Sequence, residues 1–175
     1  MASQFIHITL PDGTRKQVPA GCTVREALTP EGGRLDAKVL AAKINGEPMD
    51  LSRPLEQDAT IEPLTFESAE GREVYRHSST HIMAQAVKEV FPTAQLTIGP
   101  ALDDGFYYDF AFDRPFTPED LEKIEARAIE IMKRGLTVTR SELSKQDAIK
   151  FFQERGEGYK VELINSFDDA SPISL

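Results

Sequence analysis

The first 65 residues alternate short strands with tight turns, and this pattern leaves few folds open. Residues 4–10 alternate apolar and polar side chains, which predicts a half-buried strand. Residues 11–14, Pro-Asp-Gly-Thr, predict a tight turn, and residues 15–18 predict a second strand that returns antiparallel to the first. Thr23 and Glu26 have the spacing of a capping box, which predicts a short helix.

Three further strands complete this pattern. Residues 41–44 and 47–50 predict two strands joined by a type I′ turn at Asn45-Gly46. Residues 59–64 predict the last strand, and residues 35–40 predict an additional helical turn. The order β-β-α-β-β-β is satisfied by a small mixed sheet curled over one helix.

A polar break at residues 66–71 predicts a domain boundary. After it, residues 72–90 predict an amphipathic helix. Residues 96–100 and 106–112 predict two strands joined by a turn at residues 103–105.

Two later helices have strong start signals. Thr117 is placed to cap a helix that has Pro118 at its first position, and Gly135 is placed to end it. Ser144 and Asp147 predict the start of another helix, which ends near residue 155.

The remaining segments of the second unit predict strands and a loop. Strands are predicted over residues 136–140 and 159–164, and residues 165–175 predict a loop. Because no element closes the second unit, we expect the chain to be a piece of a longer protein. The predicted fold class is α+β, with a ubiquitin-like β-grasp domain followed by a mixed α/β domain. The predicted limits are 1–65 for the first domain, 66–71 for the linker and 72–175 for the second domain.

Composition excludes several classes of protein. Of the 175 residues, 40% are hydrophobic and 28% charged, which argues against global disorder. The net charge of −9 argues against nucleic-acid affinity over the whole surface, so any RNA contact must use selected side chains. No apolar run reaches the length of a membrane span, about 20 residues. The single cysteine, Cys22, excludes an internal disulfide and favours a reducing, cytoplasmic location.

The sharpest local signal is His77-Ser-Ser-Thr-His81. Spacing of i, i+4 places both imidazoles on one helix face, away from the apolar stripe, with Lys88 at about 20° from His77. Three interpretations stay open from the residues alone. The pair is solvated, or it is half of a metal site, or it performs acid–base or water-positioning work beside an ester.

Two further segments carry polar groups. In the aromatic run after Gly105, strand alternation places Tyr107 and Asp109 on one face, and Tyr108 with its phenylalanine neighbours on the other. A buried tyrosine needs a partner for its hydroxyl. Lys160 follows a flexible Gly-Glu-Gly loop and is either a surface lysine or a site residue.

Several sequence blocks, in order along nearly the whole chain, resemble the bacterial threonyl-tRNA synthetase family. Residues 8–13 and 39–46 resemble its TGS domain, which has a ubiquitin-like β-grasp fold. The blocks of the second unit resemble its amino-terminal editing domain: His77-x-x-x-His81, Ile98-Gly99-Pro100, Gly105-Phe106-Tyr107-Tyr108-Asp109 and Arg155-Gly156-Glu157-x-Tyr159-Lys160.

The resemblance implies hydrolytic editing of seryl-tRNA. A threonine pocket discriminates against serine, which lacks one methyl, by only about 1–3 kcal/mol, so a second site removes the wrong product. The resemblance assigns His77 and His81 to that site, Lys160 to positioning of the water or the terminal ribose, and Tyr108 to the pocket. It adds a cysteine and a histidine from a later segment, which Cys22 does not match. Whether His77 or a ribose hydroxyl activates the water stays open.

The resemblance also implies partners and cofactors. The parent enzyme attaches threonine to its tRNA with ATP, uses Mg and Zn in a core outside these residues, and forms a homodimer. The tRNA acceptor end is the expected partner here, and we expect neither a cofactor nor tightly bound zinc in this chain, because two histidines leave the site at least one ligand short. Two alternatives are a TGS-bearing regulatory or RNA-binding module without catalysis and a free-standing aminoacyl-tRNA deacylase. A TGS-bearing module of that kind lacks the editing-domain blocks found here after residue 72. A free-standing deacylase needs the later Cys/His pair in the same polypeptide.

Overall fold

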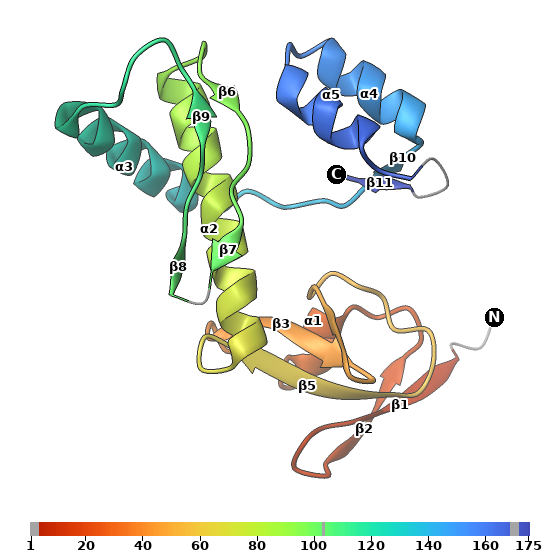
Figure 1. Ribbon diagram of the computed structural model, residues 1–175. Helices are drawn as coiled ribbons and strands as arrows, with labels where there is room; N and C mark the ends of the chain where they lie inside the picture. Colours follow the sequence, from red (N-terminus) through yellow and green to blue (C-terminus); the bar gives the residue numbers. More distant parts are fainter. Residues whose placement is uncertain (1–3, 103, 169–171) are drawn as a thin grey trace. The chain divides into compact units, whose positions relative to one another are not determined.

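The computed structural model describes residues 4–102, 104–168 and 172–175. The chain forms two compact units, Met1–Arg76 and His77–Leu175. Both contain helices and strands (Figure 1), which confirms the predicted α+β class.

The first unit is a five-stranded mixed sheet with one short helix. The order across the sheet is β2-β1-β5-β3-β4, with β1 parallel to β5 and the other neighbours antiparallel. The order of elements along the chain, β-β-α-β-β-β, is the predicted one. The elements are β1 (Phe5–Thr9), β2 (Arg15–Pro19), α1 (Val24–Leu28), β3 (Val39–Ile44), β4 (Glu47–Met49) and β5 (Ala59–Thr65).

Local signals in this unit act as predicted. Ile6 and Ile8 of β1 are buried while the residues between and before them are exposed, as strand alternation requires. Thr23 and Glu26 form the capping box of α1. Asn45 and Gly46 both have positive φ, 52° and 91°, which is the signature of a type I′ turn.

One local prediction in the first unit is wrong. Residues 35–40 do not add a helical turn, because β3 already begins at Val39, which pairs with Thr65 of β5. Pairing along the sheet outweighs the helical tendency of this short segment. Most buried apolar side chains of the unit form one cluster, made of Ile6, Ile8, Val24, Ala27, Ala42, Ile44, Leu51, Leu55, Ala59 and Ile61.

Helix α2 (Ala69–Val90) begins three residues earlier than the sequence predicts. At its start the Gly71 amide donates to the Ser68 hydroxyl, which itself donates to the Thr65 carbonyl. A Cβ on Gly71 would lie 1.8 Å from that carbonyl oxygen, so only glycine fits here. The two compact units divide inside α2, whereas the sequence places the boundary at residues 66–71.

The predicted hairpin of the second unit is split into two short ladders. Strand β6 (Gln95–Leu96) pairs with β9 (Phe110–Ala111), and β7 (Ala101–Leu102) pairs with β8 (Gly105–Phe106). Between them, Gly99 and Pro100 interrupt strand pairing, since Pro100 has no amide to donate. Asp103 of the predicted turn lies outside the described residues.

Helix α3 (Pro118–Lys133) has the predicted start and end. Thr117 caps it together with Asp120, and Gly135 has a positive φ of 57°.

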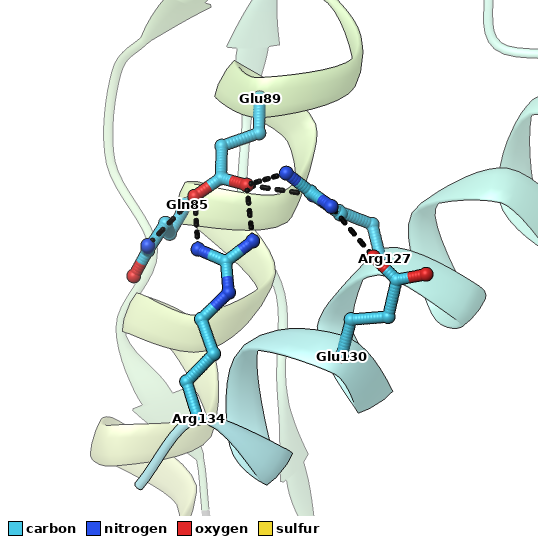
Figure 2. Close-up of polar contacts among 5 residues, drawn as sticks. All are labelled: Gln85, Glu89, Arg127, Glu130 and Arg134. Carbon is cyan, nitrogen blue, oxygen red and sulfur yellow. Dashed lines mark hydrogen bonds and ion pairs between the residues drawn. The ribbon is translucent and has the colours of Figure 1, made fainter. Parts of the chain in front are cut away.

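Glu89 of α2 connects α2 and α3 (Figure 2), because its carboxylate accepts hydrogen bonds from Arg127, Arg134 and Gln85. The Gln85 and arginine donors lower the pKa of Glu89 to about 2. Apolar residues from α2, α3 and the hairpin form the second cluster: Ala86, Val87, Ala94, Ile124 and Ile131.

The last part of the second unit contains two helices and a short ladder. Helix α4 (Lys145–Gln153) begins at the predicted Ser144 cap. Strand β10 (Glu142–Leu143) pairs antiparallel with β11 (Ile173–Ser174), where the sequence predicts a loop; residues 169–171 of that loop lie outside the described residues. A third, small cluster consists of Ala148, Ile164 and Ile173.

Two strand predictions in this part are wrong. Residues 159–164 lie in helix α5 (Gly158–Asn165), not in a strand. The more buried positions are Lys160, Val161 and Ile164, which is helical spacing, and Ile164 packs beside Ala148 of α4. Residues 136–140 do not form a strand either, and strand β10 begins only at Glu142.

Candidate active site

All four side chains that the resemblance implies for the site line one pocket of the second unit. The pocket has a volume of about 830 Å³. Helix α2 contributes His77 and His81, the hairpin contributes Tyr108, and α5 contributes Lys160. Residues separated by about 80 positions in the sequence therefore share one concave surface.

The two histidines form a direct pair on one turn of α2. Their Nε2 atoms are 3.0 Å apart and the rings meet edge to face. One ring must donate and the other accept at this distance, so the pair does not carry two positive charges without losing the hydrogen bond. The contact requires that one ring carries a proton on Nε2 and that the other does not, and it orients the two rings toward each other.

His81 is the more perturbed member of the pair. Loss of hydration in the pocket, then the neighbouring His77 and the positive charge of Lys160, lower the pKa of His81 below 6.5. Each of these three effects disfavours a second positive charge at this place. His81 is therefore mainly neutral at pH 7, the form that can accept a proton from water or from a hydroxyl.

Tyr108 is fixed by the backbone of the neighbouring strand segment. A Cβ on Gly99 would lie 2.2 Å from the Tyr108 ring, so the ring rests directly against this glycine. The ring also stacks on Phe110, with centroids 4.9 Å apart. Burial and the negative charge of Glu157 raise the pKa of Tyr108, which keeps the phenol protonated as a hydrogen-bond donor.

Lys160 lies in the first turn of α5, just after an ion pair between Glu157 and Lys88. Glu157, which is 9% exposed, precedes the first residue of this helix, and its carboxylate lies 3.0 Å from the Lys88 ammonium of α2. Lys88 also donates to the Ala94 carbonyl at 3.0 Å. The second carboxylate oxygen of Glu157 is buried and has no hydrogen-bond partner among the described residues.

Sequence reasoning missed Glu157 and Lys88 as site residues. A signal was present in each case, since Lys88 falls on the histidine face of α2 and Glu157 stands three positions before Lys160. Neither spacing alone indicates that α2 and α5 contact each other, because that contact depends on the tertiary fold.

Cys22 lies outside this pocket, as the sequence suggested. It belongs to the first unit, where it packs against the apolar cluster of the β-grasp sheet. Within the described ranges, no cluster of three or more His, Cys, Asp or Glu side chains could hold a metal ion. None of the described helices is both long enough and apolar enough to cross a membrane.

Comparison with known proteins agrees with the β-grasp sheet of the first unit. Residues 6–65 match the TGS domain family. Over 173 residues the chain is 50% identical to the threonine–tRNA ligase of Symbiobacterium thermophilum, and over 170 residues it is 48% identical to that of Citrifermentans bemidjiense. A third relative, the threonine–tRNA ligase of Acetivibrio thermocellus, is 47% identical over 171 residues.

The chain is similar to the amino-terminal region of bacterial threonine–tRNA ligases. These matches cover 97–99% of the chain, which confirms the resemblance predicted from the sequence blocks. The chain spans only 27% of the length of each of these three ligases. The identity therefore concerns one region of a much longer type of protein.

Proposed function

We propose that this chain is the amino-terminal region of a threonine–tRNA ligase and contributes the pocket that hydrolyses wrongly formed seryl-tRNA. The observation that carries the proposal is the gathering of His77, His81, Tyr108 and Lys160 around one cavity. The similarity to threonine–tRNA ligases over nearly the whole chain supports it.

The chemistry of these four groups suits hydrolysis of an aminoacyl ester. Neutral His81 can accept a proton from the attacking water or from the adjacent ribose hydroxyl. His77 holds that imidazole in place through the 3.0 Å contact. Lys160 and the Tyr108 phenol are donors for the oxyanion that develops at the ester carbonyl.

The synthetic reaction belongs to the rest of such a protein. We assign ATP, Mg and Zn, as well as dimer formation, to the part of the longer enzyme outside these residues. We assign tRNA both to that synthetic site and to the pocket described here. The acceptor end of tRNA is the partner of the pocket described here, and we place the protein in the cytoplasm.

A binding measurement on the chain itself tests this proposal. Seryl-3′-amino-3′-deoxyadenosine mimics the 3′ end of seryl-tRNA but has an amide that resists hydrolysis. In an NMR titration we expect shifts at the four pocket residues. Gly99→Ala should weaken binding about tenfold, the scale of one hydrogen bond, because its methyl displaces Tyr108.

Gly105→Ala is the matched control, since a Cβ there meets nothing within 4 Å. It should bind the analogue as the unmodified chain does. Absence of shifts at the pocket, or equal affinity of the Gly99 and Gly105 variants, would contradict the proposed site.

A further inference from the structure

Residues 136–140 have the composition of a strand but no strand partner. The segment Leu-Thr-Val-Thr-Arg is rich in β-branched residues, which favour strands. All five residues are exposed, Val138 to 89%, and they make no backbone hydrogen bond to any other described residue. A segment of strand composition whose backbone groups are left open in this way is suited to receive another strand.

The adjoining ladder fixes where such a strand would lie. In the β10–β11 pairing, Leu143 faces Ile173 and Glu142 faces Ser174. The next pair is also bonded, because Ser141 donates to the Leu175 carbonyl at 3.0 Å and Leu175 donates to the Ser141 carbonyl at 2.9 Å. The ladder thus continues to the Ser141–Leu175 pair. The next residue on the β10 side of the ladder is Arg140, and a residue that follows Leu175 would lie opposite it.

Antiparallel geometry then sets the register residue by residue. Ser141 and Leu175 exchange both hydrogen bonds, so the next pair is not hydrogen-bonded and the one after it is. Thr139 would bond to the second residue of an added strand and Thr137 to the fourth. The amides of Val138 and Arg140 would point away from it.

We propose that residues 136–140 are the receiving edge for an antiparallel strand, supplied by the segment that follows position 175 in the longer threonine–tRNA ligases. Those relatives contain such polypeptide, since the chain spans only 27% of their length. A strand that continues β11 directly beyond Leu175 would lie beside residues 136–140 in this register, so no turn is needed between them. Because Ile173, Ser174 and Leu175 line the pocket, the added strand would extend this pocket wall.

Amide hydrogen exchange, measured by NMR, tests the proposal. The chain is extended by the residues that follow the matching position in the Symbiobacterium thermophilum ligase, about six of them, the length of an average strand. Exchange at the Thr137 and Thr139 amides should slow by more than about tenfold, because both become bonded. Val138 and Arg140 should continue to exchange fast and serve as internal controls.

A second extension, with proline as its second added residue, is the matched control. Proline has no amide to donate to the Thr139 carbonyl, so the protection should disappear. Unchanged exchange in the extended chain would overturn the proposal, as would equal protection of all four amides. If the Thr137 and Thr139 amides of the unextended chain become protected as its concentration rises, the occupant of this edge is a second copy of the chain. That result would also overturn the proposal.

Discussion

The two units bury their apolar side chains in different ways. In the first unit a single buried cluster is built from β1, β3, β5, α1 and the segment after β4, and partly buried residues of β2 and β4 pack against it. In the second unit there are two clusters, one around α2, α3 and the hairpin, and a small one at α4, α5 and β11. The pocket is lined by elements of both clusters. The continuous core of the first unit supports one rigid sheet. The divided core of the second unit leaves a concave surface between its parts, and polar side chains converge on that surface.

The same substitution in each unit tests this difference, and it has the largest expected effect on stability. Ile61 is 1% exposed in the continuous cluster, and Ile164 is 4% exposed in the small one. Ile61→Ala should cost about 2–5 kcal/mol of unfolding free energy, because its surroundings cannot close around the cavity. Ile164→Ala should cost less, since the small cluster can collapse. Denaturant unfolding followed by NMR signals of each unit measures both, and an equal or larger cost at Ile164 would contradict the comparison.

A smaller effect is expected from the titration of His81. The folded chain binds a proton here only below the lowered pKa, while the unfolded chain binds it below 6.5. Between these values the unfolded state holds more protons, so the stability of the second unit rises with pH. This contribution is complete above 6.5 and is lost as the pH falls toward the lowered pKa.

Histidine ring signals followed by NMR against pH measure this directly. The His81 midpoint should lie below 6.5 and should rise in Lys160→Met, which removes a positive charge. His7→Ala, in β1 of the first unit, should leave it unchanged. A His81 midpoint at or above 6.5 would show that the pocket does not disfavour its charged form.

How much the sequence predicts also differs between the units. In the first unit every strand follows from local alternation or turn residues, and the capping box of α1 is confirmed. In the second unit the caps of α3 and α4 are confirmed as well. Caps and turns are local signals, because their hydrogen bonds connect residues three or four positions apart.

The failures depend on tertiary contacts. The segment of α5 alternates like a strand, and only its packing beside α4 selects a helix. Residues 136–140 have strand composition, yet a strand also needs a partner. The sequence indicated His77, His81, Tyr108 and Lys160, but not the ion pair of Lys88 and Glu157, which depends on tertiary contact between α2 and the start of α5.

The central claim is that the second unit carries hydrolytic editing chemistry, and deacylation of seryl-tRNA tests it most directly. The measurement is a single-turnover assay with a threonine–tRNA ligase that carries this chain as its amino-terminal region. His81→Ala should slow hydrolysis by about 10²–10⁴-fold while threonine activation stays intact, because one positioned acid–base group is lost. His7→Ala, a histidine of the first unit, should leave hydrolysis unchanged. Hydrolysis at the unmodified rate in His81→Ala would contradict the account.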